Sequence, residues 1–369
     1  MRVLVVIQSN QRVRYLEAAF ESMVAHGIEL TVATLEPEGP IHSHLQGQGI
    51  RALSGLGTRY IDALRTGRTL RRMHRSERFD IVHTHEVIPT ICVCLGLWRT
   101  PPTRIYHRHH QRGRRRLTWA SRLASLSTDF TIAVSAAAAT DSIHCDWRSK
   151  AKVDVAHHGV PSMRDVTAEE LTELRARLGI PDVPVVVMMA RMRSEKGHSV
   201  FIESFCQLPS DGSHAPHAVL VGNGPLFDDV EKAASHLSSD RIHVIDYQED
   251  VALWYALADV VVIPSIRESF GLTAIEAMAS RRPVVASSVG GLSEVIVDGE
   301  TGLLVPSRDP QALSQAMNSL LEDREWAGRL AAAGFRRYCE SFTTVHMVER
   351  WTTIYEKRLP SARNSPATA

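Results

Sequence analysis

Two glutamates, Glu268 and Glu276, stand eight positions apart on either side of a Phe270-Gly271 pair. Glu268 comes shortly after the apolar run VVVIPS, and Glu276 lies in a stretch with a helical pattern. Carboxylates accept hydrogen bonds from sugar hydroxyls. The spacing alone leaves two interpretations open: a ligand that lies across the turn, or two solvated surface charges.

The turn between these glutamates predicts an anion site. We expect a strand to end near Ser265 and a helix to begin at Gly271, so that the amides of Phe270, Gly271 and Leu272 are helix-start donors without intrahelical partners. A helix start of this kind binds phosphate groups, and glycine allows the ligand to approach the backbone closely.

A basic turn follows an earlier predicted strand. The stretch ARMRSEKG places Arg191 and Lys196 after the run PVVVMM, where the two cations could grip a phosphate. A solvated basic turn is the alternative. The stretch VGNG adds Gly222 and Gly224, which form half of a dinucleotide-binding fingerprint. Because Phe227 stands where the third glycine should be, a tight turn without a ligand is equally compatible.

Histidines gather at the ends of two predicted strands: His83 and His85 end one, and His107, His109 and His110 end another. Imidazole clusters can bind metal, but no HExxH or Cys-His spacing accompanies these residues. The chain also lacks an Asp-x-Asp pair for a phosphate-bound Mg²⁺, a Walker A loop and a GxSxG elbow. We therefore expect neither a metal nor a cofactor.

Short apolar runs alternate with helical patterns along the chain, which predicts an α/β fold with parallel sheets. One series of runs includes RVLVVIQ, ELTVATL and FTIAVS, and a second includes PVVVMMAR, HAVLVGNG and DVVVIPS. Two series predict two Rossmann-like doubly wound domains, residues 1–160 and 161–342, with the break at HHGVPSMRD. Open parallel sheets bind ligands at the carboxyl ends of their strands, so we expect the site in a cleft between the domains.

Composition indicates an ordinary globular protein. The chain has 369 residues, 44% of them hydrophobic and 22% charged, which suits two domains. Its five cysteines are few and odd in number, which favours free thiols in a reducing cytoplasm. The first apolar run is too short for a signal peptide, and no stretch approaches the roughly 18 apolar residues of a membrane span. We expect a cytoplasmic protein.

Charge is distributed unevenly. Residues 1–160 hold 22 Lys and Arg against 13 Asp and Glu, a net +9, whereas residues 161–369 hold 20 against 28, a net −8. A basic half suits an anionic partner. The arginine-dense stretch Arg108–Arg116 precedes an amphipathic helical pattern, which is compatible with peripheral binding to an anionic membrane, with an anionic acceptor, or with an ordinary surface helix.

In their order, these motifs resemble those of the family 4 glycosyltransferases, which have the GT-B fold. The matching stretches are ARMRSEKG, LVGNGP and a long run from LADVVVIPSIRESFGL to ETGLLVP, with VHTHE, IAVS and HHGVP in the first half. The resemblance implies retaining, metal-independent transfer of a sugar from a nucleotide-diphosphate sugar. The acceptor would be a glycan, a lipid-linked molecule or a secondary metabolite, and the setting cell-envelope polysaccharide or glycolipid synthesis. Nucleic acid is not expected as a partner.

The resemblance also assigns roles to individual residues. It implies that Arg191 and Lys196 hold the donor diphosphate, and that the amides of Gly271 and Leu272 donate to it. Glu268 would lie near the sugar hydroxyls as a catalytic residue. Glu276 would accept hydrogen bonds from the ribose. The catalytic histidine that meets the donor sugar would be His109 or His110.

The resemblance further implies that the last helix, around 343–358, returns onto the first domain, and the polar tail 359–369 is expected to be disordered. Three positions depart from the family pattern. QSNQRVR replaces a paired-glycine loop, where Arg12 would supply a substrate contact. His158 replaces an asparagine. Arg281 replaces a helix-ending glycine, so a left-handed conformation there would cost about 1–2 kcal/mol.

Two alternative functions remain compatible with the sequence. One is a nucleotide-sugar epimerase with the same fold, which needs acid and base groups but no acceptor. The other is a non-catalytic module that binds nucleotide-sugars or nucleic acid, which the basic first half permits. The presence of Arg191, Lys196, Glu268 and Glu276 together argues against such a module, because binding alone does not require all four.

Overall fold

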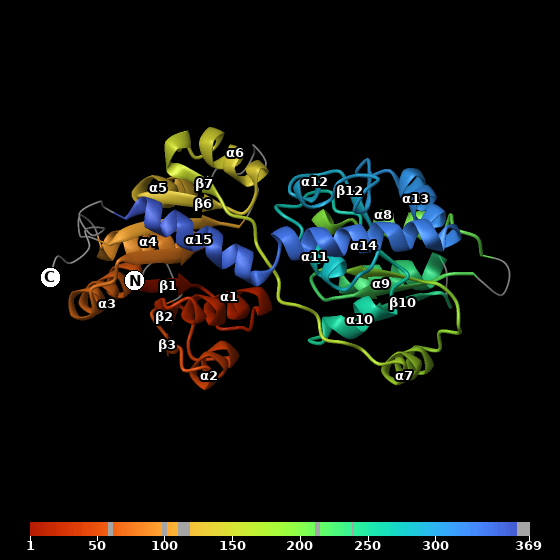
Figure 1. Ribbon diagram of the computed structural model, residues 1–369, viewed down its shortest axis with the longest axis horizontal. Coiled ribbons are helices and arrows are strands. Elements are labelled where there is room, and N and C mark those ends of the chain that lie inside the picture. The colour runs from red at the N-terminus through yellow and green to blue at the C-terminus, as the bar shows by residue number, and fades with distance from the viewer. Residues whose placement is uncertain (58–61, 98–101, 110–118, 211–214, 238–239, 360–369) are drawn as a thin grey trace. The chain divides into compact units, whose positions relative to one another are not determined.

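A computed structural model describes residues 1–57, 62–97, 102–109, 119–210, 215–237 and 240–359. The chain divides into two compact units: unit 1 comprises residues 1–161 and 344–369, and unit 2 comprises residues 162–343. Figure 1 shows that the last helix belongs to unit 1 although unit 2 precedes it in the sequence. The tail beyond residue 359, for which the sequence predicts disorder, lies outside the described residues.

Unit 1 contains a parallel sheet of seven strands in the order β3-β2-β1-β4-β5-β6-β7. The order reverses direction between β1 and β4, which makes this the switch point where doubly wound sheets bind ligands. The strands are β1 (Arg2–Ile7), β2 (Glu29–Thr34), β3 (Arg51–Leu53), β4 (Ile81–His85), β5 (Thr103–Arg108), β6 (Phe130–Ala133) and β7 (Val153–Val155).

Helices cover both faces of this sheet. Helices α1 and α15 pack against each other over one face, where Phe20, Trp351 and Tyr355 are buried, and α3 packs on α4 over the other. The helices are α1 (Arg14–Ala25), α2 (Pro40–Gly47), α3 (Ala63–Glu77), α4 (Val87–Gly96), α5 (Trp119–Ser127), α6 (Ala136–His144) and α15 (Thr344–Arg358), with a 3-10 turn η2 (Lys150–Lys152).

Unit 2 contains a parallel sheet of six strands in the order β10-β9-β8-β11-β12-β13, with its switch point between β8 and β11. The strands are β8 (Val185–Met189), β9 (His217–Val221), β10 (Ile242–Ile245), β11 (Val260–Ile263), β12 (Val284–Ser287) and β13 (Leu303–Val305). The helical elements are α7 (Ala168–Leu178), η3 (Ser194–Lys196), α8 (His198–Phe205), α9 (Phe227–Leu237), α10 (Val251–Leu257), α11 (Leu272–Ala279), α12 (Leu292–Val295), α13 (Pro310–Glu322) and α14 (Arg324–Ser341).

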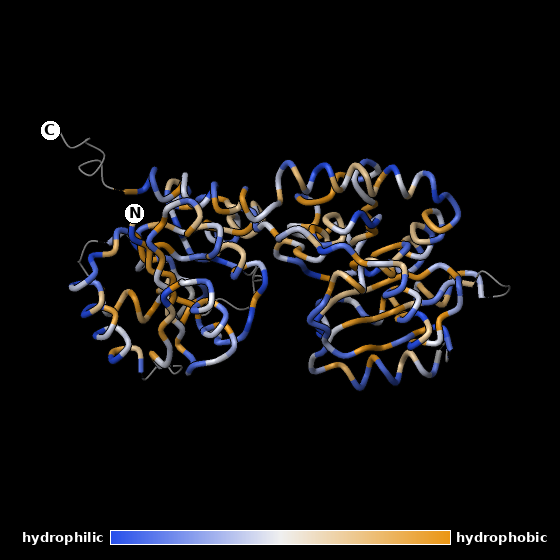
Figure 2. The backbone as a smooth tube through the Cα atoms, turned by 60° about the horizontal axis from the view of Figure 1, so that its bottom comes forward, coloured by the Kyte–Doolittle hydropathy of each residue, from blue (hydrophilic) through white to orange (hydrophobic). Residues whose placement is uncertain are grey.

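The valine-rich runs explain why these strands form and why they lie inside. All four residues of β11 are buried, as expected of a parallel strand covered on both faces. In Figure 2 the strands of unit 2 are mostly coloured as hydrophobic, whereas the outer turns of its helices are hydrophilic. The predicted α/β architecture of two Rossmann-like units is confirmed. Among the described residues, none of the helices combines the length and the apolar composition that a membrane span requires.

Candidate active site

Lys196 and Glu268 lie together at the carboxyl edge of the unit 2 sheet. Their residues follow β8 and β11, the two strands at the switch point. The Lys196 ammonium Nζ is 2.6 Å from Glu268 Oε2, and the Ser265 hydroxyl donates to the same oxygen at 3.2 Å. Both charged side chains are largely buried, with 25% and 15% of their surfaces exposed. The structure therefore joins two residues that the sequence places 72 positions apart.

Close backbone contacts hold this pair in place. Gly197 has a φ of +75°, and a Cβ atom there would lie 2.0 Å from the carbonyl oxygen of Pro264. The amide of Ile266 donates to the carbonyl oxygen of Glu195 at 2.8 Å. The two loops after β8 and β11 thus approach as closely as a glycine permits. Gly197, which has no side chain, permits this close approach of the two loops, and the approach brings Lys196 into contact with Glu268.

Helix α11 begins at the same edge. Gly271 is its N-cap, with a φ of +114°, and no side chain among the described residues caps this helix. The first amides of α11 therefore point out of the helix without intrahelical acceptors, next to the ion pair of Glu268. Phe270 is buried and contributes its ring to the core beside Phe342, so only its backbone is available to a ligand.

Glu276 lies one turn further into α11. Its Oε2 atom accepts a hydrogen bond of 2.9 Å from the hydroxyl of Tyr255, a fully buried residue of α10. The carboxylate is half-buried and oriented by this bond. Glu268 and Glu276 are thus held by different partners, and they form no pair with each other that the structure records.

Arg191 and Gly222 differ in the groups that they present to a ligand. The Arg191 side chain is exposed, and the part of the chain that the structure describes gives it no ion pair. The amide of Gly222 already donates to the carbonyl oxygen of Ile245 at 2.9 Å. A Cβ atom at Gly222 would lie 2.0 Å from the carbonyl oxygen of Ala190, so this glycine is required where the loops after β8 and β9 meet.

A row of histidines occupies the corresponding edge of unit 1. His83 and His85 of β4 lie beside His107 of the neighbouring strand β5 and His109, which directly follows it, because residues two apart in an extended strand point to the same face. The His107 and His109 rings are stacked, with centroids 4.4 Å apart. Trp351 of α15 contacts this face with its ring edge.

His109 is fully engaged in this row. Its Nε2 atom is 2.7 Å from His85 Nδ1, and its Nδ1 atom is 3.2 Å from His158 Nε2. A neutral imidazole has one donor and one acceptor nitrogen, so both are satisfied in the row. A sugar hydroxyl can therefore bind a nitrogen of His109 only by replacing one of these bonds, and the longer bond to His158 is the weaker one. His110 lies outside the described residues.

Burial keeps His83, His85, His107 and His158 neutral. Together with the charge of a nearby histidine, burial lowers the pKa of His83 and that of His158 to about 3. The pKa values of His85 and His107 are also well below the ordinary value, chiefly because of burial. His83 is also bonded to the buried hydroxyl of Tyr355, with Nδ1 and the oxygen 2.6 Å apart.

The same row is where the described residues could hold a metal. Ring nitrogens of His83, His85 and His107 lie within 4.8 Å of one another, as do those of His107, His109 and His158. Within the described residues, the buried Nε2 atoms of His85 and His107 have no hydrogen-bond partner. The expectation of a metal-free site remains a prediction.

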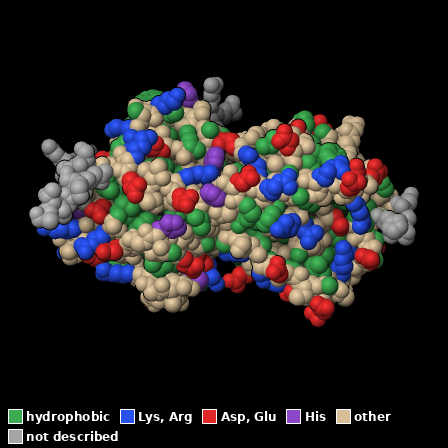
Figure 3. All heavy atoms as spheres, in the orientation of Figure 1, with side chains coloured by type: hydrophobic (Ala, Val, Ile, Leu, Met, Phe, Trp, Pro, Cys, Tyr) green, Lys and Arg blue, Asp and Glu red, His purple; other side chains and the backbone are tan. Residues whose placement is uncertain are grey.

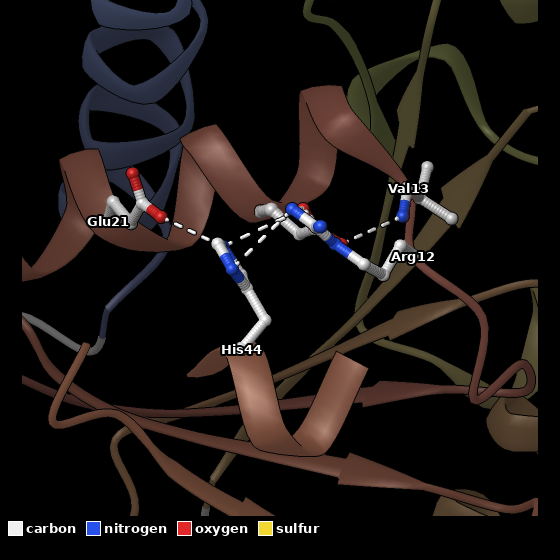
Figure 4. Close-up of polar contacts among 5 residues, drawn as sticks. Arg12, Val13, Glu21 and His44 are labelled. Carbon is white, nitrogen blue, oxygen red and sulfur yellow. Dashed lines mark hydrogen bonds and ion pairs between the residues drawn. The ribbon is translucent and has the colours of Figure 1, made fainter. Parts of the chain in front are cut away.

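Arg12 belongs to a separate ion-pair network in unit 1. Its Nη2 atom donates to Glu17 Oε2 at 2.9 Å, and Glu17 is 3% exposed. His44 lies 3.0 Å from Glu21 and 3.5 Å from Arg12. Figure 4 shows Arg12 and His44 pointing toward one another, with Glu21 beyond His44. The buried carboxylate of Glu17 matches the charge of Arg12, so an anionic ligand would compete with it.

One prediction needs correction. The sequence includes Arg108 in a surface stretch, but its side chain is 2% exposed, forms an ion pair with Asp146 and lies 3.9 Å from Asp141. Arg108 ends β5, and its side chain points to the face opposite the histidines, where α6 supplies Asp141 and the loop after α6 supplies Asp146. Residues 110–118, the rest of the stretch, lie outside the described residues.

Sequence reasoning missed three residues of these edges. Tyr255 and Ser265 orient the two glutamates through single hydroxyl groups, and no motif signals them. Glu86 directly follows β4 with a φ of +73°, a strained conformation for a residue with a side chain. Burial and then Glu36 raise the pKa of the Glu86 carboxyl. Strain of this kind is concentrated at functional sites.

Two family models match the chain, one over each unit. The model described as Glycosyltransferase Family 4 matches residues 13–164, and the model described as Glycosyl transferases group 1 matches residues 171–337. The chain belongs to the glycosyltransferases that these two models describe, as the motifs predict.

Named relatives match about half of the chain. A D-inositol 3-phosphate glycosyltransferase of Xylanimonas cellulosilytica is 34% identical over 214 residues, which are 56% of this chain and 51% of that protein. An alpha-D-kanosaminyltransferase of Streptomyces kanamyceticus is 32% identical over 202 residues, which are 52% of each protein. The matched part of the chain thus spans about half the length of these relatives.

A solved structure matches nearly the whole chain. Anabaena HepE in complex with UDP-glucose has a TM-score of 0.84 and 20% sequence identity, over 97% of this chain and 100% of that one. This likeness concerns the fold. It confirms the expectation of a GT-B fold, which two Rossmann-like units make up.

Proposed function

We propose that the protein is a retaining, metal-independent glycosyltransferase that uses a nucleotide-diphosphate sugar. The observation that carries this proposal is the arrangement at the edge of unit 2, where Lys196, Glu268 and the uncapped start of α11 lie together. A cation and helix-start amides suit a diphosphate, and the neighbouring carboxylate suits sugar hydroxyls.

The leaving group explains why no metal is needed. When the glycosyl–phosphate bond breaks, negative charge develops on the diphosphate. Lys196, the exposed Arg191 and the first amides of α11 are preorganised to stabilise that charge. In other enzymes a divalent cation supplies this stabilisation. We therefore propose that the charges of the chain replace it.

Glu268 acts on the sugar and not as a nucleophile in this proposal. Its carboxylate is already bonded to Lys196 and Ser265, which holds it beside the diphosphate. There it accepts hydrogen bonds from the sugar and tolerates the positive charge of an oxocarbenium-like transition state. The leaving phosphate takes the proton of the attacking acceptor on the same face, which retains the anomeric configuration.

Glu276 suits the ribose of the donor. The Tyr255 hydroxyl orients its carboxylate, and a carboxylate can accept several hydrogen bonds at once, ribose hydroxyls among them. The names of the relatives add two compounds to test: an inositol 3-phosphate as the acceptor, and kanosamine as the sugar that is transferred. A glycan or lipid-linked acceptor of the cell envelope completes the set.

The decisive test is a panel of nucleotide-sugars with and without candidate acceptors, scored by release of the nucleoside diphosphate and by product mass. Acceptor-dependent release with a retained anomeric configuration supports the proposal. Interconversion of nucleotide-sugars without an acceptor would show an epimerase, and binding without turnover of any pair would show a binding module.

A chelator tests the metal-free mechanism. Activity that survives incubation with EDTA and dialysis supports it, because the stabilising charges belong to the chain. Activity that is lost with EDTA and restored by one metal would contradict it. Measuring bound metal in the purified protein separates a catalytic ion from one held by the histidine row.

We also propose peripheral contact with an anionic membrane through unit 1. Leu123 and Leu126 of α5 are about half exposed, and Trp147 nearby in the unit is 67% exposed. The guanidinium of Arg122 lies 4.0 Å above the Trp147 ring. Exposed apolar groups with a cation suit a lipid surface. Binding to anionic vesicles that salt reverses supports this contact, and equal binding to neutral vesicles contradicts it.

A further inference from the structure

A pocket opens at the amino edge of the unit 2 sheet, opposite the edge that carries the candidate active site. Its volume is about 200 Å³. Pro184, Asp259 and Pro283 line it, and each directly precedes a strand of the sheet: β8, β11 and β12. Because the strands are parallel, this edge lies at the far end of the sheet from Lys196 and Glu268.

Three arginines line the pocket: Arg281, Arg282 and Arg324. The structure gives none of them an ion pair within the residues it describes, and Asp259 is the acidic residue of the lining. Asp259 also accepts a hydrogen bond from the amide of Val185 at 2.8 Å. Three guanidinium groups against one carboxylate leave an excess of positive charge, which an anion would neutralise.

The Arg282 guanidinium lacks a partner at one atom. Its Nη1 atom donates to the carbonyl oxygen of Ala258 at 3.1 Å. Its Nε atom is buried and has no hydrogen-bond partner in the described part of the chain. Burial lowers the pKa of Arg282, and Asp259 opposes that shift only in part. A buried donor left unsatisfied is costly, so the site is incomplete without an acceptor.

Arg281 is held over the pocket by a strained backbone. Its φ is +55°, in the left-handed region that favours glycine, as the sequence leads us to expect. The guanidinium lies 3.5 Å above the ring of Phe335 in α14. This cation–π contact fixes the direction of the side chain and offsets part of the strain.

The start of α14 completes the basic wall. Arg324 is the first residue of this 18-residue helix, and its exposed side chain also lines an adjoining cavity of about 360 Å³. The Asp323 carboxylate caps the start of this helix and accepts a hydrogen bond from the amide of Trp326 at 2.8 Å, so the Arg324 side chain is what α14 offers to an anion. Figure 3 shows Lys and Arg side chains exposed along α14 on the face that it displays.

We propose that this pocket binds a phosphate group, either free or as a small phosphate monoester, at a site separate from the donor. Arg282 offers the Nε edge of its guanidinium, a geometry that matches two phosphate oxygens. Arg281 and Arg324 supply charge from either side. The adjoining cavity next to Arg324 has room for the organic part of a monoester.

The experiment uses the full chain with Lys196→Ala, which weakens phosphate binding at the donor site. Inorganic phosphate and glycerol 3-phosphate are titrated by calorimetry, with sodium chloride at the same ionic strength as the reference. We expect saturable binding with one site per chain. Tighter binding of the monoester identifies an ester as the ligand type, and tighter binding of inorganic phosphate identifies the free ion.

Arg324→Ala is expected to weaken this binding roughly tenfold, because it removes one charged hydrogen-bond donor. Arg329→Ala is the matched control, since Arg329 is exposed on the same helix, is paired with Glu325 and does not line the pocket. Arg281→Gly is the second variant, because glycine adopts a φ of +55° without strain and the fold is retained. Binding that is absent, or that is equal in Arg324→Ala, Arg281→Gly and the control, would overturn the proposal.

Discussion

Glu268 is held by two donors from different loops, the Lys196 ammonium and the Ser265 hydroxyl. A carboxylate oriented in this way keeps one geometry when the donor arrives, and preorganised groups of this kind contribute most to catalysis. The orientation of Glu276 by Tyr255 follows the same principle on α11. At the scale of residues, the chemistry therefore depends on hydroxyl groups that hold the charged side chains.

Replacing Glu268 by Gln is the sharpest residue-level test. The variant keeps the size of the side chain but removes the charge beside Lys196, so we expect kcat to fall roughly 10²-fold or more. The unfolding midpoint should change little, because the side-chain oxygen of Gln can still accept the hydrogen bonds of Lys196 and Ser265. Glu203→Gln, an exposed glutamate of α8, is the control. A normal kcat in Glu268→Gln would remove Glu268 from the site.

Gly197 offers a test of the loop contact. In Gly197→Ala the new Cβ atom would lie 2.0 Å from the carbonyl oxygen of Pro264, and the backbone is left-handed. We expect a loss of roughly 2 kcal/mol or more in the free energy of unfolding, together with weaker donor binding. Gly179→Ala is the matched control, because its φ is +68° but nothing lies within 4 Å. The free energy of unfolding of both variants is measured by chemical denaturation. Equal losses would show that the left-handed backbone alone, and not the contact with Pro264, accounts for the effect at Gly197.

Among the elements of unit 1, strands β4 and β5 place a row of histidines in the core beneath α15. His83, His85 and His107 are buried as neutral rings against Trp351. Among the described residues, the groups whose charges act on these rings are other histidines, which lower the pKa values of the rings together with burial. The pairing of β4 with β5 is therefore stable only while these histidines stay unprotonated.

This predicts an acid-sensitive unit 1. Burial lowers the pKa of His83 and of His158 from 6.5 to about 3 in the fold. Their contribution to stability is therefore complete above pH 6.5 and is lost as the pH falls from 6.5 toward 3. The loss is about 1.4 kcal/mol per pH unit for each histidine.

Amide hydrogen exchange measures this loss segment by segment. Between pH 7.5 and 5, after correction for intrinsic rates, protection of β4 and β5 should fall more than protection of β8 and β11. Unit 2 serves as the internal comparison, because its strands β8 (VVVMM) and β11 (VVVI) contain no histidine. Equal behaviour of the two sheets would contradict a role for the histidine row.

At the scale of the whole molecule, unit 1 is built from both ends of the chain. Helix α15 returns after unit 2 and brings Met347, Trp351 and Tyr355 into the core of unit 1. Unit 2, by contrast, is continuous in sequence. The two units should therefore respond differently when the end of the chain is removed.

A chain that ends at Thr343 tests this difference. We expect unit 1 to lose its cooperative unfolding transition, because the apolar face under α15 becomes exposed and His83 loses its hydrogen-bond partner Tyr355. Unit 2 should still bind the nucleoside diphosphate with nearly unchanged affinity. Calorimetric titration of both chains gives the comparison, and a truncated chain with two intact transitions would refute the expectation.

The alternation of strands and helices in both units could be predicted from the amino-acid sequence, because valine-rich runs and glycine turns are read directly from neighbouring residues. The roles of Arg191, Lys196, Glu268 and Glu276 come from the resemblance of the ordered motifs to the family, and they stay predictions. The left-handed backbone of Arg281 agrees with the resemblance, in which a glycine ends the helix at this position.

The hydrogen-bond and ion-pair partners of these residues are known from the folded chain alone. Lys196 meets Glu268 across 72 positions, Glu276 meets Tyr255, and His109 is held between His85 and His158. The tertiary structure also buries Arg108, which the sequence places at the surface. Each of these contacts depends on strand order and on the face to which a side chain points, and neither is encoded in a local stretch of residues.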